Sequence, residues 1–166
     1  MDSLKSMFKK GPGPDKEVVS ILKKIPVFQG LTAGELTSVA AIMHKREFNK
    51  GEVIMRQGSA GHGMYIIVDG SVAISEDSAG KALAELHNGD FFGEMALLYK
   101  SPRMATATAR THCKVLSFFQ TTLTKLASDS PALGSKIISR LTGIAEQRLH
   151  MTKEQVAALK KELGGE

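Results

Sequence analysis

Apolar residues near the start of the chain repeat with helical spacing. After the chain breakers at residues 11–14, the first apolar stripe comprises Val18, Ile21, Leu22 and Ile25. This spacing places the side chains on one face of an α-helix, and Pro26 ends the helix because proline lacks the backbone N–H that a helix needs. Thr32 and Glu35 then have the spacing of a capping box, which predicts the start of a second helix. The apolar face of the second helix comprises Leu36, Val39, Ala40 and Met43.

Further along the chain, the period of the apolar residues changes to two, which is typical of β-strands. The strand-like segments are residues 52–55, 64–68, 71–75, 82–86, 105–110 and 113–118. Asp69-Gly70 lies between two of these segments and is a strong signal for a hairpin turn. Short strands separated by glycines predict an antiparallel β-roll or jelly-roll barrel.

The period becomes helical again after Phe119. We predict a short helix around Leu123 and Leu126 that ends near Pro131, then a longer helix, then a last helix that ends at Gly164-Gly165. The apolar residues of the longer helix are Leu133, Ile137, Ile138, Leu141, Ile144 and Ala145, and those of the last helix are Val156, Leu159 and Leu163. The predicted fold class is therefore α+β, an antiparallel β-roll or jelly-roll barrel flanked by N-terminal and C-terminal helices.

Length and composition agree with one ordinary domain. The chain has 166 residues, 42% of them hydrophobic and 23% charged, which is enough for a single core. We expect a flexible N-terminal arm at residues 1–14, a ligand-binding domain at residues 15–149, and a helical tail or lid at residues 150–166. The sequence has no apolar run of membrane-spanning length and a single cysteine, Cys113. We therefore expect a cytoplasmic protein without a transmembrane segment.

The net charge of +5 changes this interpretation only slightly. The basic residues are spread along the chain, and the aromatic content of 5% includes no tryptophan. A nucleic-acid surface usually combines a basic stripe with aromatic residues. The excess of positive charge therefore favours a small anionic ligand over nucleic acid.

The candidate chemistry lies in residues 92–108. Gly93 allows the backbone to approach a ligand closely, and residues 95–98 suit a short helix whose first N–H groups form an anion site. Arg103 follows, and its guanidinium can bind two phosphate oxygens at once. Glu94 adds an acceptor for a hydroxyl group. One acid and one base on a short loop fit a ribose phosphate.

The run from Gly93 to Tyr99, followed by Pro102-Arg103-Met104-Ala105-Thr106-Ala107, closely resembles the phosphate-binding cassette of cyclic-nucleotide-binding domains. These domains occur in the regulatory subunits of protein kinase A, in cyclic-nucleotide-gated channels and in the bacterial catabolite activator protein. The resemblance extends from about residue 25 to about residue 149, and the upstream glycines at 51, 58, 70 and 89 fit its pattern. It identifies residues 15–149 as a cyclic-nucleotide-binding domain.

The resemblance implies a role for each cassette residue. Arg103 would neutralise the cyclic phosphate, and the backbone N–H groups of Ala96 and Ala105 would donate to its oxygens. Glu94 would accept a hydrogen bond from the ribose 2′-hydroxyl, and the backbone of Gly93 would lie against the ribose. The remaining ligand-binding residues of this set are Met95 and Met104. Within the roll, alternation along the strands suggests an apolar pocket wall of Ile66, Val72 and Leu83.

Met104 favours cAMP over cGMP. Relatives that select cGMP often have a Thr or Ser at this position, whose hydroxyl meets the guanine amino group, and methionine has no equivalent donor or acceptor. In this family a residue of the C-terminal helices often stacks on the base. The candidates by position are Arg148, Leu149, His150 and Met151.

We expect the chain to be a non-catalytic sensor that passes the bound nucleotide to an unknown effector protein. Residues 150–166 are too few for the DNA-binding domain of the catabolite activator type. The helical stripe from Leu133 to Ile144 could pair two copies of the chain, or pack within one. Two alternatives stay open: a degenerate domain that acts as a protein-interaction module, and a cupin-like enzyme. The enzyme is disfavoured, because the five histidines form no metal-binding pair of usual spacing and we expect no metal.

Overall fold

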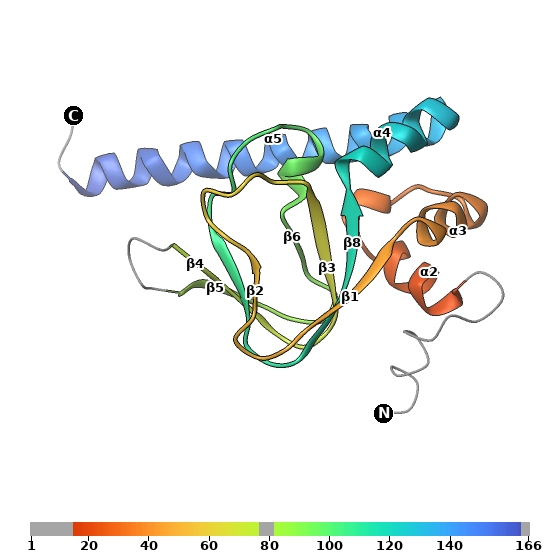
Figure 1. Ribbon diagram of the computed structural model, residues 1–166. Coiled ribbons are helices and arrows are strands. Elements are labelled where there is room, and N and C mark those ends of the chain that lie inside the picture. The colour runs from red at the N-terminus through yellow and green to blue at the C-terminus, as the bar shows by residue number, and fades with distance from the viewer. Residues whose placement is uncertain (1–14, 77–81, 164–166) are drawn as a thin grey trace.

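The computed structural model describes residues 15–76 and 82–163. The predicted arm at residues 1–14 and the predicted helix end at Gly164-Gly165 lie outside these ranges. Figure 1 shows a β-roll with helices against one side and one long helix above it. The described part therefore has the predicted arrangement of N-terminal helices, strands and C-terminal helices.

The roll consists of two antiparallel sheets of four strands each. The first has the order β1 (His44–Phe48), β8 (Cys113–Phe119), β3 (Gly63–Asp69) and β6 (Phe91–Phe92). The second has the order β2 (Val53–Met55), β7 (Thr106–Ala109), β4 (Val72–Ser75) and β5 (Ala82–Leu86). The predicted antiparallel roll is confirmed, and its described strands form two separate sheets instead of a closed barrel.

Strand β3 divides the hydrophobic core into two clusters. Because side chains alternate along a strand, Tyr65 and Ile67 face the other sheet, whereas Met64 and Ile66 face the helices. The prediction that Ile66 lines a pocket inside the roll is therefore wrong, since this side chain is fully buried against the helices. Val72 packs in the core between the sheets, and Leu83 is largely exposed.

The two predicted N-terminal helices are present as α2 (Lys16–Lys23) and α3 (Ala33–Ala41). A 3₁₀ turn that was not predicted, η1 (Pro26–Phe28), lies between them. The capping box of α3 is confirmed, because the Thr32 hydroxyl accepts from the Glu35 N–H and the Glu35 carboxylate accepts from the Thr32 N–H. Leu36 and Val39 of this helix are buried in the core.

The C-terminal part consists of α4 (Gln120–Asp129) and a single helix of 32 residues, α5 (Pro131–Glu162). The sequence predicted a longer helix and a separate last helix, but the helix continues because only isolated glycines interrupt its pattern. Its first part buries Leu133, Ile137 and Leu141 among the N-terminal helices of the same chain. Most of the apolar stripe that could have paired two copies is therefore buried within its own chain.

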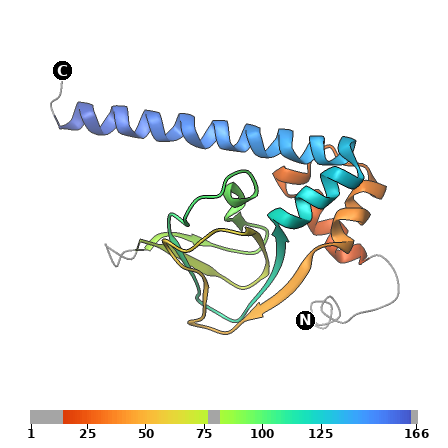
Figure 2. The same cartoon turned by 45° about the horizontal axis from the view of Figure 1, so that its top comes forward.

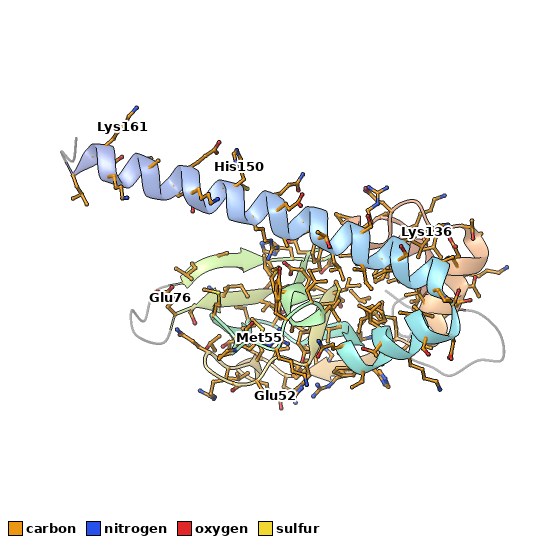
Figure 3. All side chains as sticks on the ribbon, turned by 90° about the horizontal axis from the view of Figure 1, so that it is seen from above. Glu52, Met55, Glu76, Lys136, His150 and Lys161 are labelled. Carbon is orange, nitrogen blue, oxygen red and sulfur yellow. The ribbon has the colours of Figure 1, made fainter. Side chains whose placement is uncertain are left out.

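The second part of α5 extends beyond the helical layer and passes over the roll (Figure 2). Seen from above, His150 and Lys161 project from this part on the side away from the strands (Figure 3). Among the described helices, none is both long enough and apolar enough to cross a membrane.

Two glycines of α5 allow a matched test of how tightly α4 and α5 pack. A methyl group on Gly134 would lie 2.5 Å from Cα and Cβ of Ala127, whereas one on Gly143 would have no neighbour within 4 Å. Gly134→Ala should lower the free energy of unfolding by about 1–3 kcal/mol because the helices must separate. Gly143→Ala should raise it by about 0.5–1 kcal/mol through helix propensity. Urea unfolding followed by circular dichroism measures both, and an equal gain for both variants would contradict the packing.

Candidate functional site

The cassette begins with a left-handed turn. Gly93 follows β6 with φ of 76° and precedes the 3₁₀ helix η2 (Glu94–Leu97). A side chain is strained at this φ, and a Cβ on Gly93 would also lie 2.6 Å from Nη1 of Arg103. The N–H of Ala96 donates to the carbonyl of Gly93 at 3.2 Å, which closes the short helix. Glycine at 93 is therefore required by both the backbone and the neighbouring guanidinium.

Arg103 is the central side chain of the site. It is only 8% exposed. Its Nη1 donates to the carbonyl of Gly93 at 2.9 Å and its Nη2 donates to the carbonyl of Gly63 at 2.6 Å. Its own N–H donates to the carbonyl of Ser59 at 2.8 Å. These bonds fix the guanidinium between the cassette turn and the start of β3.

The positive charge of Arg103 has no ion-pair partner among the described residues. Two neutral carbonyls accept from it, and its guanidinium lies 5.9 Å from the ring centre of Tyr65. Burial lowers the pKa of Arg103, because removing the charged group from water is unfavourable. A buried arginine without a carboxylate partner is a suitable site for an anion.

Two glycines where β3 begins, Gly61 and Gly63, were missed in the sequence analysis. A Cβ on Gly63 would lie 2.3 Å from the carbonyl oxygen of Phe118, and one on Gly61 would lie 2.9 Å from Cβ of Ala96. Gly63 must therefore lack a side chain to pair closely with β8, and Gly61 must lack one to pass beside the cassette. The signal was available, since two glycines flank His62 directly before a strand-like run.

Glu94 is the second charged residue of the cassette and is 1% exposed. The guanidinium of Arg148, on α5, lies against its carboxylate as an ion pair. Neither carboxylate oxygen has a hydrogen bond of regular geometry within the described residues. Burial raises the pKa of Glu94, and the nearby positive charges of Arg148 and Arg103 oppose this shift without cancelling it.

The structure brings some of the candidate residues together and leaves others apart. Gly93, Glu94, Ala96 and Arg103 form one cluster, with Met95 and Ala105 half-buried beside it. Met104 is 86% exposed. Three lid candidates have described side chains: Arg148 contacts the cassette, His150 pairs with Glu154 at 3.3 Å, and Met151 is exposed. The side chain of Leu149 lies outside the described part.

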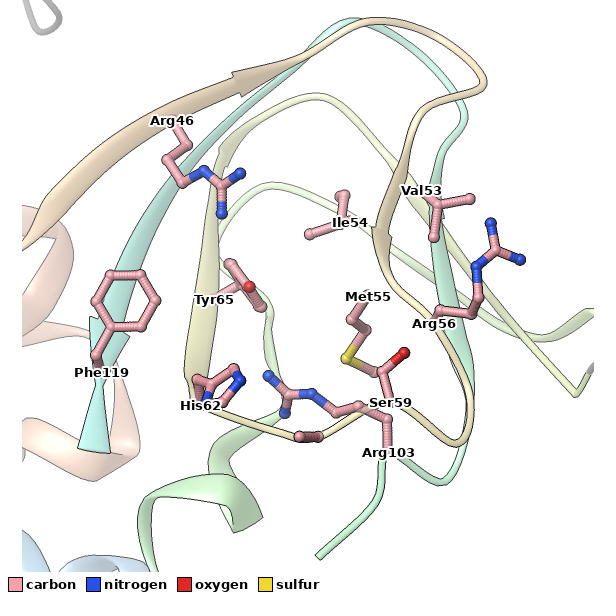
Figure 4. A pocket seen from close by; sticks show the side chains of 11 residues that line it. Arg46, Val53, Ile54, Met55, Arg56, Ser59, His62, Tyr65, Arg103 and Phe119 are labelled. Atoms are coloured by element: carbon pink, nitrogen blue, oxygen red, sulfur yellow. The ribbon is translucent and has the colours of Figure 1, made fainter. Parts of the chain in front are cut away.

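A cavity of about 450 Å³ lies beside this cluster. Figure 4 shows Arg103 pointing into it together with Arg46, close to Tyr65. Gly93, Glu94 and Ala96 do not line it, and neither do Ile66, Val72 and Leu83. The cavity and the cassette therefore meet at Arg103, and the cavity is not the pocket that the sequence suggested.

An antiparallel roll with a buried arginine in a glycine-bounded cassette is a fold and site of a class suited to an anionic ligand. A model of the cyclic nucleotide-binding domain matches residues 45–130. The chain belongs to the cyclic nucleotide-binding domain family.

Known proteins with related sequences include a regulatory subunit and a channel. The cAMP-dependent protein kinase regulatory subunit of Dictyostelium discoideum is 38% identical over 94 residues, 53% of this chain and 29% of the relative. A cyclic nucleotide-gated potassium channel of Rhizobium etli is 34% identical over 117 residues, 70% of this chain and 32% of the relative. The chain thus spans less than a third of the length of these relatives.

A solved structure also resembles the fold. The regulatory domain of the Toxoplasma gondii protein kinase, crystallised with cAMP, superimposes with a TM-score of 0.65 at 27% identity. The match covers 74% of this chain and 48% of that one.

Gly93 and Gly89 form a matched pair for testing the contact with Arg103. Both have positive φ, 76° and 87°, but a Cβ on Gly89 would have no neighbour within 4 Å. Gly89→Ala should cost about 1–2 kcal/mol of stability from backbone strain alone. Gly93→Ala should cost about 1–3 kcal/mol more, because the guanidinium must leave its two carbonyl acceptors. Chemical denaturation compares them, and equal losses would show that Arg103 is not held as described.

The raised pKa of Glu94 gives stability a defined dependence on pH. Below the unfolded-state pKa this residue is protonated in both states and causes no penalty. As pH rises from the unfolded-state pKa through the higher folded-state pKa, the carboxylate ionises more readily in the unfolded chain, and the free energy of unfolding falls. Glu94→Gln should therefore match the wild type at acidic pH and exceed it in unfolding free energy at neutral pH.

Denaturation at several pH values measures this difference. Glu85→Gln is the control, because Glu85 is an exposed carboxylate paired with Arg110. A constant difference between Glu94→Gln and the wild type at all pH values would contradict the shift.

Proposed function

We propose that the cassette binds a cyclic nucleotide, with the phosphate on Arg103. The observation that carries this proposal is the buried guanidinium of Arg103, which has two carbonyl acceptors and no ion-pair partner among the described residues. A cyclic phosphate carries one negative charge and two free oxygens, which match a planar guanidinium. The N–H groups of Ala96 and Ala105 are proposed to complete the phosphate contacts, which requires the Ala96 N–H to leave the Gly93 carbonyl.

The ribose is proposed to bind at Glu94. The carboxylate is almost fully buried and lacks a regular hydrogen bond, so a hydroxyl donor at this place would satisfy it. The ribose 2′-hydroxyl is such a donor, and the backbone of Gly93 lies directly before Glu94 to receive the sugar. A ribonucleotide is therefore favoured over its 2′-deoxy analogue.

For the base, we propose cAMP in preference to cGMP. Met104 offers neither donor nor acceptor to a guanine amino group. Two of the similar proteins support this choice, because one is a cAMP-dependent kinase regulatory subunit and the other was crystallised with cAMP. Met95 stays a predicted ligand-binding residue without an assigned contact. The α5 positions Arg148, Leu149, His150 and Met151 stay candidates for stacking on the base.

We propose that the output is regulatory and non-catalytic. The names of the relatives describe kinase regulation and channel gating. The ion pair of Glu94 with Arg148 links the ribose site to α5, so a sugar that binds Glu94 must share or replace this contact. A lid movement of residues 150–166, an effector protein that senses it and a pairing of two copies stay predictions.

Titration calorimetry of the full chain with cAMP tests the proposal. Arg103→Ala should weaken binding by about 2–5 kcal/mol, because a partly buried phosphate would lose its charged partner. This corresponds to a loss of about 30-fold to several thousand-fold in affinity. Arg110→Ala is the control and should leave binding unchanged. Arg110 is an exposed arginine directly after β7 and pairs with Glu85 at 3.8 Å.

Thermal unfolding of each variant separates lost binding from lost structure. Undiminished binding by a folded Arg103→Ala variant would contradict the phosphate assignment. The wild type should bind cAMP more tightly than cGMP and form no AMP from cAMP, and AMP formation would overturn the non-catalytic role.

A further inference from the structure

The cavity beside Arg103 opens along the edges of the two sheets. Its wall comes from β1, from β2 and the residues after it, from the start of β3, and from the end of β8. We call it the edge cavity, and the lining residues that matter here are Arg46, Ile54, Arg56, Tyr65, Arg103 and Phe119. Its volume of about 450 Å³ lies in the range of small-molecule sites.

The edge cavity is positively charged. Three arginines and His62 line it, and no carboxylate does. Arg46 and Arg56 form no ion pair within the described residues. The acidic side chains on adjacent segments are engaged elsewhere, since Glu47 pairs with His112 at 3.0 Å and Glu52 accepts from the backbone of Asn49. The local excess of positive charge is therefore not neutralised by the protein itself.

The guanidinium groups of two of these arginines are held in position. Arg46 lies 4.9 Å from the ring centre of Phe48, and Arg103 is fixed by the carbonyls of Gly63 and Gly93. In Figure 4 both guanidinium groups point toward the space beside Tyr65, and Arg56 stands at the rim. Fixed donors lose little conformational freedom when a ligand binds.

Apart from Ser59, the rest of the wall consists of apolar and aromatic residues. Tyr65 and Ile54 are each 8% exposed, and Phe119 lies at the end of β8 beside them. Tyr65 is itself stacked on Phe92 with ring centres 5.3 Å apart, which fixes the plane of its ring. A flat hydrophobic body would pack on these rings, and a charged group on it would reach the arginines.

We propose that the edge cavity is a second binding site, separate from the cassette, for a small organic anion with a flat apolar body. Its charged group is a phosphate monoester or a carboxylate, bound by Arg46 and Arg56, and its body lies against Tyr65 and Phe119. Arg103 forms the wall between this site and the cassette. An anion in the edge cavity partly neutralises the charge that the cassette offers to its own ligand.

Methionine methyl NMR of the full chain tests the site directly, because Met55 lines the edge cavity. The probes are phenyl phosphate, benzoate and the uncharged benzyl alcohol, added to protein with labelled methionine methyl groups at low salt. The Met55 signal, assigned with Met55→Leu, should shift saturably with at least one of the two anions. The anion that binds more tightly identifies the charged group.

The charge requirement is tested with a double variant. Arg46→Gln combined with Arg56→Gln should lower the affinity for the anion by at least about tenfold, since two charge-assisted contacts are lost. Arg110→Gln is the control, because it removes one exposed arginine outside the edge cavity. The proposal is overturned by the absence of a saturable shift with both anions, by an equal shift with benzyl alcohol, or by unchanged binding in the folded double variant.

A second measurement tests whether an anion in the edge cavity affects binding at the cassette through Arg103, and this step rests on the proposed function. Saturating phenyl phosphate or benzoate should weaken cAMP binding in calorimetry by about fivefold, the lower end of common coupling between sites. In the double variant, the anion should no longer weaken cAMP binding. If the anion still weakens cAMP binding in this variant, it competes directly at the cassette, and the proposed coupling is wrong. Failure of the wild type to bind cAMP without any probe would instead refute the proposed function and leave the Met55 result standing.

Discussion

The two hydrogen bonds from the Arg103 guanidinium to the carbonyls of Gly63 and Gly93 are the constraint on which the site depends. They join the cassette, which follows β6, to the start of β3, although 30 residues separate Gly63 from Gly93 in the sequence. The side chain can occupy this place only because Gly61 and Gly93 leave room for it. The carbonyls orient the charge without neutralising it, so the cassette retains its attraction for an anion.

Glu94 extends this constraint to the C-terminal helix. Its carboxylate is buried in the cassette, and the charge that faces it belongs to Arg148 on α5. A buried carboxylate is stable only with a partner, so the position of α5 and the charge state of the cassette are not independent. This contact explains why a helix that extends beyond the roll is still connected to its binding site.

The sequence predicted those features that depend on residue type and spacing. The capping box at Thr32 and the cassette itself are of this kind. The hairpin predicted at Asp69-Gly70 is wrong, because β3 and β4 on either side of this turn pair in different sheets. Strand β1 was missed because four of its five residues are exposed, so it has no apolar alternation to detect. The acceptors of Arg103 were missed because a backbone carbonyl has no signature in the sequence. Alternation along β3 predicts that its side chains lie on two faces, but not which face packs on the helices and which on the other sheet. Ile66 was therefore assigned to the wrong face.

Residues 59–63 show how the charge at Arg103 connects to the helices. The carbonyl of Ser59 accepts from the backbone N–H of Arg103 and that of Gly63 accepts from its guanidinium. The carbonyl of His62, between them, accepts from the N–H of Gln120 at 2.8 Å, where α4 begins. A ligand that draws the guanidinium away from Gly63 therefore acts on the peptide that holds the first residue of α4. Since α4 packs on α5 through Gly134, residues 59–63 and the long helix are joined by one continuous series of contacts. Under the proposed function, this series is the route by which an anion at Arg103 would act on α5.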